Sequence, residues 1–390
     1  MNKSERDNFI RQQVLSLPEL AEQQLEGCFG PGLRDLMTMA EIFDARKIIL
    51  TGCGDSYAAA IAMAPVIERY CDCFGVRVMR AIEFTRFLSR AEIGIGEPNS
   101  PLAIAISASG GSARVCEALE KANHVGAFSI LLTNNPSSRA AKIAKRVYTV
   151  GTPAFPNDSP GLRSYFGSLV GLIAFATRLG HVRGTLPPTG PSDFRKAIQT
   201  YVDSYADVME QIDDQMFALA QKWKDIQKFD FIGDDVGYGS AFFGAAKFVE
   251  CNGCSVSVDD SEDWCHINYF IKDPATIGTV VMADKNSPSF GRIQETVGSA
   301  VKIGRPVLVV TNAEKSDFEA GAEVCTLPHA PQGYEWMLPL MDYIPASLLA
   351  GYLSELQGEA FFRHNENEAN NPFANRDCYT LSTSKIEIIG

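Results

Sequence analysis

The chain has 390 residues, of which 46% are hydrophobic, and its formal net charge is −12 at pH 7. That length suffices for two domains of ordinary size, each with its own buried core. The acidic balance argues against nucleic acid or a membrane as a partner, because phosphates and anionic lipids attract positively charged surfaces. An anionic ligand would therefore need a local site.

The N-terminus predicts no export. The opening stretch MNKSERDNFIRQQVLSLPEL has scattered charges and lacks the apolar core of a signal peptide. Apolar runs such as SLVGLIAFAT are shorter than the roughly 20 residues that span a bilayer. Ten cysteines are spread along the chain, and without a signal peptide they are expected to be reduced. The sequence predicts a cytoplasmic protein.

Short apolar strands alternate twice with helical patterns, which is typical of parallel strands covered on both faces. The pattern predicts an N-terminal helical segment over residues 1–45 and a first doubly wound domain over residues 46–183. A linker and connecting helix follow over 184–228, where the prolines and glycines of GTLPPTGPSD cannot continue a helix. A second doubly wound domain over 229–355 and an irregular C-terminal tail over 356–390 complete the predicted α/β fold.

The two predicted domains resemble each other. KIILTGCGDSYAAAIAMAPVIE and FDFIGDDVGYGSAFFGAAKFVE share an apolar strand, a glycine-containing turn and an Ala-rich helix, with Gly52 and Gly233 at matching points. GAFSILLTN, which ends at Asn134, matches GRPVLVVTN, which ends at Asn312. This repeat predicts two copies of one fold.

A run of serines and glycines follows the apolar strand LAIAI of the first domain. In SASGGSA, Ser107, Ser109 and Ser112 stand with Gly110 and Gly111. Ligands of open parallel sheets bind beyond the carboxyl ends of the strands, where glycines admit a ligand close to the backbone and a helix N-terminus favours an anion. An N-capping serine in a tight turn explains one Ser and one Gly but not the whole run. The run predicts a cradle for phosphate or another small anion.

Groups suited to acid–base chemistry occur in the second domain. Lys247 and Glu250 are three residues apart, so they share one face of a predicted helix that is too apolar for a surface position. His266 follows sixteen residues after Glu250, and histidine exchanges protons near neutral pH. The plainer readings are an ordinary ion pair and a structural histidine.

A metal site is the alternative reading of this region. CNGC (Cys251 and Cys254), with Cys265 and His266, has ligand types that suit zinc. A second CxxC pair is missing, and Cys251 continues an apolar helical run. Buried thiols are therefore favoured, and no metal is predicted.

GCGDSY, ISASGGSARV and GAFSILLTNNPSSRAAKIA together resemble the sugar isomerase (SIS) domain family, whose first module binds phosphosugars with CGTS-like and SxSGxT-like loops. GAAKFVE, with its histidine sixteen residues after the glutamate, resembles the second module of the isomerase half of glucosamine-6-phosphate synthase and of the fructosamine-type phosphosugar deglycases. The resemblance runs from about residue 46 to the C-terminus. It implies two flavodoxin-like domains, no cofactor, and a homodimer with shared active sites, because the family's histidine loop reaches a neighbouring subunit.

The resemblance also implies a phosphate-binding set on two loops, which comprises Cys53, Gly54, Asp55, Ser56, Ser107, Ala108, Ser109 and Ser112. Asp55 departs from the threonine that the family often has. It is expected either to bind a sugar hydroxyl or a substrate ammonium, or to be a carboxylate that the helix dipole favours.

The catalytic set that the resemblance implies lies in the second module and the tail. Glu250, with Lys247 beside it, would move a proton between C1 and C2 of the open-chain sugar. His266 would open the ring, although HIN here replaces the usual HGP. Lys385 would meet the sugar carbonyl, or else is a solvated terminal charge. The surrounding STSKIEI also alternates like an edge strand.

The sequence thus predicts an enzyme that acts on a phosphorylated sugar. Cleavage or deamination of an amino sugar or sugar–amine adduct is slightly favoured over aldose–ketose isomerisation, since Asp55 and the acidic run DDSED (259–263) suit an amino group, although DDSED is more simply a solvated loop. A non-catalytic phosphosugar sensor is the alternative from another class, but no basic recognition helix is visible. Residues 1–45 are too few for a glutamine amidotransferase, so glutamine-driven synthesis is not expected.

Overall fold

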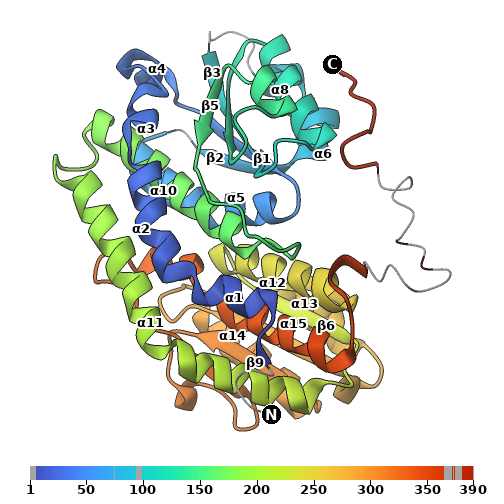
Figure 1. Cartoon of the computed structure of the whole chain (residues 1–390). Coiled ribbons are helices and arrows are strands. Elements are labelled where there is room, and N and C mark those ends of the chain that lie inside the picture. The colour runs from blue at the N-terminus through green and yellow to red at the C-terminus, as the bar shows by residue number, and fades with distance from the viewer. Residues whose placement is uncertain are drawn as a thin grey trace. The chain divides into compact units, whose positions relative to one another are not determined.

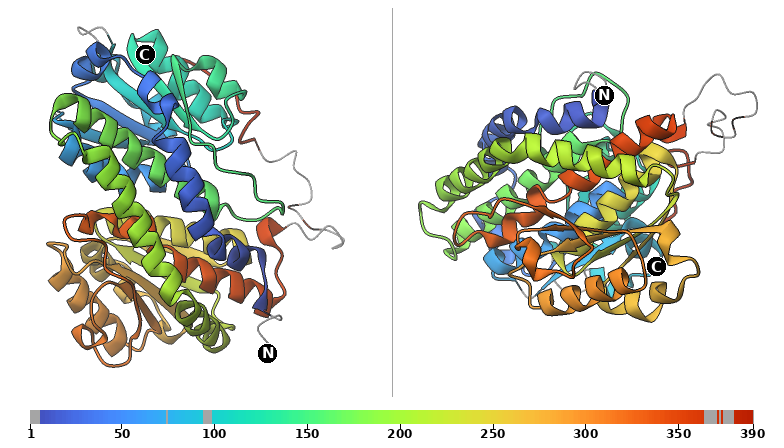
Figure 2. Two further views of the ribbon diagram at one scale, coloured as in Figure 1. Left: turned by 60° about the vertical axis from the view of Figure 1, so that its left-hand side comes forward. Right: turned by 90° about the horizontal axis from the view of Figure 1, so that it is seen from below.

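The computed structural model describes residues 6–73, 75–93, 99–363, 371, 373 and 380–389. The chain forms two compact units, and neither is one continuous stretch. Unit 1 comprises Met1–Pro18, Phe155–Leu162 and Ala197–Arg376, and unit 2 comprises Glu19–Ala154, Arg163–Lys196 and Asp377–Gly390. Each unit holds a five-stranded parallel sheet with helices on both faces (Figures 1 and 2). The predicted fold of two doubly wound α/β domains is confirmed.

The sheet of unit 2 has the strand order β2-β1-β3-β4-β5, and neighbouring strands are parallel. Its strands are β1 (Ile48–Gly52), β2 (Val76–Arg80), β3 (Asn99–Ile106), β4 (Ala127–Thr133) and β5 (Arg146–Thr149). The central strands β1 and β4 are buried along their whole length, because helices cover both faces. The chain reverses its direction across the sheet between β1 and β3, and ligands of such sheets bind at this switch point.

Right-handed crossovers in opposite directions place α5 and α6 on opposite faces of this sheet. The helices α6, α8 and α9 pack together on one face. The helices of this part of the chain are α2 (Leu17–Cys28), α3 (Pro31–Asp35), α4 (Met39–Asp44), α5 (Asp55–Cys71), α6 (Ala81–Arg86), α7 (Arg90–Ile93), α8 (Ala113–His124), α9 (Arg139–Ile143) and α10 (Leu162–Arg183).

The helix α10 is longer than the apolar run SLVGLIAFAT predicts. It has 22 residues, and by length and composition it could cross a membrane. However, 83% of its apolar window is buried inside the protein. Close packing accounts for that burial, since a Cβ atom on Gly171 would approach Val150 Cγ1 to 2.5 Å. Within its unit α10 is thus a core helix.

Unit 1 repeats the architecture of unit 2. Its parallel sheet has the order β10-β9-β8-β6-β7, which read from the other end is the order of unit 2. The strands are β6 (Lys228–Gly233), β7 (Ser255–Asp259), β8 (Ile277–Ala283), β9 (Val307–Thr311) and β10 (Glu323–Thr326). The α-helices are α1 (Phe9–Leu15), α11 (Gly190–Trp223), α12 (Val236–Asn252), α13 (Ser261–His266), α14 (Phe290–Lys302) and α15 (Ile344–Gln357), where α11 begins in unit 2. The 3-10 helices are η2 (Asn268–Phe270), η3 (Pro274–Thr276), η4 (Lys315–Asp317), η5 (Glu335–Leu340) and η6 (Phe361–Arg363).

The matching glycines of the repeat have a steric cause. Gly52 ends β1 and Gly233 ends β6. A Cβ atom on Gly52 would lie 2.8 Å from Ser56 Cβ, and one on Gly233 would lie 2.3 Å from the Gly237 carbonyl oxygen. In both units the first strand therefore turns so tightly into its helix that no side chain fits.

Asp342 is a buried carboxyl group in unit 1, two residues before α15, with 3% of its surface exposed. Burial raises its pKa from 3.8 to about 8, and the nearby Asp284 carboxylate acts in the same direction. The folded state therefore holds a proton that the unfolded chain releases. The stability from this proton is present in full below pH 3.8 and is lost as the pH rises through about 8.

We expect Asp342→Asn to raise the melting temperature, because the amide needs no proton. The gain should grow from pH 5 to pH 8 and then level off, with each kcal/mol worth about 2–4 °C. The exposed Asp207→Asn substitution in α11 is the matched control. Melting curves of the three proteins between pH 5 and 9 test this, and a gain that does not change with pH would contradict the raised pKa.

Candidate functional site

Two loops of unit 2 leave neighbouring strands at the switch point of the sheet. Residues 53–54 join β1 to α5, and residues 107–112 join β3 to α8. Because β1 and β3 are adjacent and parallel, both loops lie at the same edge. Cys53 Sγ of the first loop is 4.0 Å from Ser112 Oγ of the second. The structure thus brings together the loop residues that the sequence predicts for the cradle.

Backbone and side-chain hydrogen bonds hold the second loop in shape. Ser107 Oγ accepts a hydrogen bond from the Gly110 N–H at 3.1 Å, and Ser107 is buried. The Ala108 carbonyl accepts hydrogen bonds from the Asn134 N–H at 3.0 Å and from Thr133 Oγ1 at 3.1 Å. These contacts give Ser107 and Ala108 a structural task within the loop.

Gly110 and Ser109 have contrasting places in this loop. Gly110 has a φ of +63°, and a Cβ atom there would lie 2.0 Å from Ser138 Oγ, so glycine is required for both reasons. Ser109 is exposed, and its Oγ accepts a hydrogen bond from the Gly111 N–H at 3.3 Å. Of the loop serines, Ser109 is therefore the one that a ligand reaches most directly.

The first loop ends at the start of α5. Gly54 has a φ of +54°, and Asp55 is the first residue of the helix. A carboxylate is favoured there by the helix dipole, and the same position within residues 53–56 also suits a sugar hydroxyl or a substrate ammonium as its partner, so the position fits both expectations for Asp55. Ser56, in the same first turn, is half-buried.

In unit 1, Lys247 and Glu250 form the pair that their spacing predicts. Lys247 Nζ is 2.5 Å from Glu250 Oε2. The Lys247 side chain has no exposed surface and its ammonium lies 4.6 Å from the centre of the Phe243 ring, whereas 28% of the Glu250 side chain is exposed. An ammonium buried beside a reachable carboxylate differs from an ordinary surface pair, because the desolvated charge fixes its partner. The carboxylate is thus oriented and still accessible.

His266 ends α13, which follows the carboxyl end of β7. Its side chain is 68% exposed, and Nε2 lies 2.9 Å from Glu262 Oε1, one turn earlier. The hydrogen bond with His266 lowers the pKa of the Glu262 carboxyl. The HIN sequence also has a structural reason, because the Asn268 side chain is buried and donates to Ser257 Oγ at 3.0 Å. Asn268 thereby ties the segment after His266 to β7.

Carboxylates of the acidic run DDSED are engaged in hydrogen bonds within the protein, so the run is less available to a ligand than the sequence suggests. Asp260 caps α13 by accepting hydrogen bonds from the N–H groups of Glu262 and Asp263. Asp259 accepts a hydrogen bond from the Asn268 amide, and burial raises the pKa of its carboxyl. The run is therefore neither a wholly solvated loop nor an open acceptor for an amino group.

The cysteines of this region are buried thiols. Cys251 and Cys254 have less than 4% of their surface exposed. Burial raises the pKa of both thiols, that of Cys254 to about 12, so both stay protonated at neutral pH. Within residues 6–73, 75–93 and 99–363, no three His, Cys, Asp or Glu side chains are grouped so that they could hold a metal ion.

The tail residues 380–389 lie in unit 2 and are irregular. The rest of the tail after residue 363, apart from residues 371 and 373, is outside the described residues. Lys385 is 81% exposed, and its ammonium pairs with the Glu387 carboxylate. The edge strand that STSKIEI predicts is wrong, because the alternation has another cause: Ile386 packs against the core beside α8 while its neighbours point outward.

Arg114 and Glu117 in α8 are residues that the sequence did not single out. Arg114 Nη1 is 2.5 Å from Glu117 Oε2, and the Glu117 side chain has no exposed surface. Arg86 of α6 reaches the same oxygen at 3.0 Å. In the sequence, opposite charges at positions i and i+3 of a helix indicate a surface ion pair. Only the amphipathic pattern of α8 indicates that Glu117 lies on the buried face.

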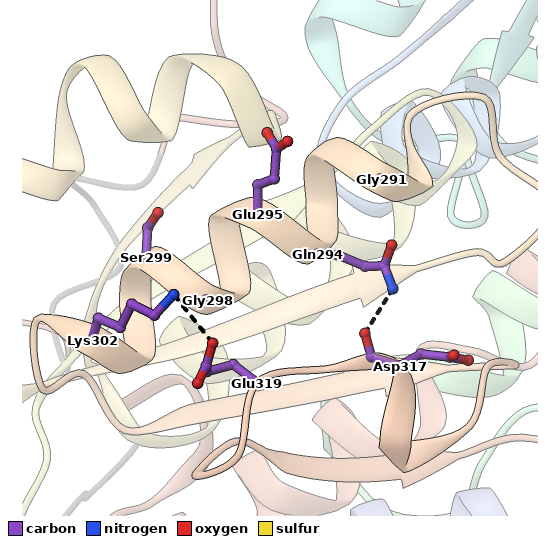
Figure 3. A pocket seen from close by; sticks show the side chains of 8 residues that line it. All are labelled: Gly291, Gln294, Glu295, Gly298, Ser299, Lys302, Asp317 and Glu319. Atoms are coloured by element: carbon purple, nitrogen blue, oxygen red, sulfur yellow. Dashed lines mark hydrogen bonds and ion pairs between the residues drawn. The ribbon is translucent and has the colours of Figure 1, made fainter.

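A shallow groove of about 680 Å³ lies elsewhere in unit 1, between α14 and the segment that contains η4 (Figure 3). Its lining is polar and includes Glu295, Asp317 and Glu319. Gln294 donates to the Asp317 carbonyl at 2.7 Å, and Lys302 pairs with Glu319 at 3.2 Å. An acidic lining repels a phosphate, so this groove is not the candidate site.

The chain matches no family model. It is 22% identical over 384 residues to glutamine–fructose-6-phosphate aminotransferase [isomerizing] 1 of Arabidopsis thaliana, which covers 92% of this chain and 53% of the relative. The chain thus spans about half the length of the curated relatives it matches.

Solved structures share the fold over most of the chain. The C-terminal domain of glucosamine-fructose-6-phosphate aminotransferase from Francisella tularensis is 17% identical, with a TM-score of 0.79, and the match covers 90% of this chain and 97% of that one. Glucosamine-6-phosphate deaminase from Thermotoga maritima is 15% identical, with a TM-score of 0.62, and covers 90% of this chain and 96% of its own. Sequence and fold together confirm the predicted resemblance: the chain has the double sugar isomerase (SIS) fold and is a relative of the isomerizing aminotransferases.

Proposed function

We propose that this protein is an enzyme that moves a proton between C1 and C2 of a phosphorylated amino sugar or sugar–amine adduct. One observation carries the proposal: in a chain related to isomerizing aminotransferases over 92% of its length, a carboxylate is held beside a fully buried ammonium. Glu250 is the base, since a carboxylate in partial burial suits this transfer. Lys247 orients it.

The remaining groups supply binding and ring opening. The substrate phosphate lies on residues 53–56 and 107–112, where Ser109 is exposed and the N-terminus of α8 favours an anion. His266 opens the ring, because an imidazole suits proton transfer and its side chain is 68% exposed, beside the Glu262 carboxylate. Lys385 meets the open-chain carbonyl. No cofactor takes part in this scheme.

Two observations favour an amino substrate. The names of the aminotransferase relatives and of the glucosamine-6-phosphate deaminase both pair a hexose 6-phosphate with an amino group. Asp55, at the start of α5, is a carboxylate beside the cradle. Aldose–ketose isomerisation is the second candidate, because the relatives are isomerizing enzymes and the same base would serve. The cytoplasmic location that the sequence predicts belongs to this proposal.

Thermal shift with matched ligand pairs tests the binding part. We expect hexose 6-phosphates or hexosamine 6-phosphates to raise the melting temperature, and their unphosphorylated forms not to, since a ligand stabilises the state that binds it. Ser109→Ala should reduce the shift, whereas Ser192→Ala, in the first turn of α11, should not. Equal shifts with and without the phosphate would remove the cradle from the proposal.

A homodimer is part of the proposed function, and the segment after His266 supports it. Ile267 and Phe270, three residues apart, are 62% and 74% exposed, and clustered exposed apolar side chains mark interaction surfaces. We expect Phe270→Asp to shift the protein toward the monomer in light scattering, because a charge would be buried in the interface. Phe87→Asp, at a side chain that is 78% exposed in unit 2, is the matched control. A monomeric wild-type protein would contradict the proposal.

A further inference from the structure

The end of the chain is bound along α8 of unit 2 (Figure 1). The Leu381 carbonyl accepts a hydrogen bond from the Ala113 N–H at 2.9 Å, and Ala113 is the first residue of α8. The Arg114 guanidinium donates to Ser384 Oγ at 3.1 Å and to the Lys385 carbonyl. We call residues 381–387 the strap. These contacts reach its main chain and one hydroxyl group.

Glu117 holds the far end of the strap. Its Oε2 atom accepts a hydrogen bond from the Glu387 N–H at 2.9 Å, in addition to the guanidinium groups of Arg86 and Arg114. A carboxylate without exposed surface is costly unless it is paired and hydrogen-bonded. With Arg86 and Arg114 it forms a buried charged cluster beneath the strap, and this cluster accepts a hydrogen bond from the Glu387 N–H.

The strap is fixed on both sides of Lys385. Arg114 binds at residues 384 and 385, Glu117 binds at residue 387, and the Ile386 side chain packs against the core beside α8. The Lys385 side chain remains 81% exposed. The main chain is therefore held, while the Lys385 ammonium lies at the surface beside the Glu387 carboxylate.

We propose that Arg114 and Glu117 are positioning residues, which bind the strap and so place Lys385 for its reaction. This inference rests on the proposed function, in which Lys385 meets the sugar carbonyl. The Ala113 N–H that the strap takes is next to Ser112 of the cradle. The strap and the phosphate-binding loop thus share the N-terminus of α8, which puts Lys385 and the cradle in one unit of the protein.

Trypsin cleavage of the full chain after Lys385 measures the docking of the strap without any assay of activity. Cleavage follows the population of the open strap when opening is fast. Glu387→Pro removes the N–H that Glu117 binds, and it should raise the cleavage rate about tenfold, which is the value of a hydrogen bond to a charged group. Glu387→Ala removes the same carboxylate, which pairs with Lys385 and lies 3.7 Å from Arg86, but it keeps the N–H, so Glu387→Pro should be cleaved faster than Glu387→Ala.

Arg114→Ala should also raise the rate about tenfold or more, because it removes the contacts with Ser384 and Lys385. Arg77→Ala, in an exposed pair with Glu92 in the same unit, is its control. Intact mass spectrometry follows the cleaved product. If neither Glu387→Pro nor Arg114→Ala accelerates cleavage, Arg114 and Glu117 do not hold the strap and the inference fails, whatever the reaction of the protein.

A double-mutant cycle with Lys385→Ala tests the positioning role. If Arg114 acts through Lys385, Arg114→Ala lowers kcat in the wild-type background but changes it less than about twofold in Lys385→Ala. Additive losses would place the effect of Arg114 elsewhere and overturn the role. Full activity of Lys385→Ala would overturn both this role and the proposed one of Lys385, while the cleavage result would still report whether the strap is docked.

Discussion

Glu250→Gln is expected to lose about 10²- to 10⁴-fold of its proton-transfer rate while binding the phosphorylated ligand nearly as well as the wild type. The amide has the shape of the carboxylate but is not a base. Glu250 is 28% exposed and contacts the buried Lys247, so we expect a glutamine of the same shape to keep its position. Incorporation of deuterium from D2O at C1 or C2 of hexose and hexosamine 6-phosphates, followed by NMR, measures the transfer for isomerase and deaminase alike.

Two comparisons make this result specific. Glu295→Gln replaces an exposed carboxylate of α14 in the same unit and should exchange at the wild-type rate. Thermal shift of Glu250→Gln by the same ligand reports binding separately. Wild-type exchange by Glu250→Gln would assign the base elsewhere. Absence of exchange by the wild-type protein, with binding intact, would favour the sensor over the enzyme.

Gly110→Ala is expected to disrupt the loop of residues 107–112, which is the proposed phosphate site. The new Cβ atom would lie 2.0 Å from Ser138 Oγ and 2.5 Å from Ser138 Cβ, at a φ of +63° that side chains rarely adopt. The left-handed conformation costs about 1–2 kcal/mol, and the overlap adds about 1–3 kcal/mol of unfolding free energy. We expect a lower melting temperature and loss of the shift by phosphorylated ligands, both measured in one scan.

Gly126→Ala separates the two causes. Gly126 also has a positive φ, of +86°, but a Cβ atom there would meet no atom within 4 Å. This variant should carry the conformational cost alone and keep its response to ligand. If Gly110→Ala retains the full ligand shift, residues 107–112 do not form the anion site.

Local sequence patterns carried much of the fold. Apolar runs that alternate with helical periods predicted parallel strands covered on both faces, and β1 and β4 are buried throughout. The offset repeat predicted two copies of one sheet, and the matched glycines at 52 and 233 are required by the same tight turn. Such features can be predicted from the sequence because they depend on residues that are close together along the chain.

The details of the site depended on distant neighbours. DDSED suggested an acceptor for an amino group, but Asp260 caps α13 and Asp259 binds Asn268. STSKIEI alternates as a strand does, yet Ile386 packs beside a helix. Alternating apolar and polar residues indicate that one side of a segment is buried and the other is exposed. They do not indicate whether a strand or a helix covers the buried side.

By itself the sequence determined the two doubly wound domains, the tight strand-to-helix turns and the closeness of Lys247 to Glu250, because each follows from residues within one strand, turn or helix. The tertiary structure alone decided that Lys247 is fully buried while Glu250 stays partly exposed, that Glu117 has no exposed surface, and that residues 381–387 lie along α8. Burial and pairing of a charge depend on every segment that packs around it, and these segments come from parts of the chain as far apart as residues 86, 117 and 387.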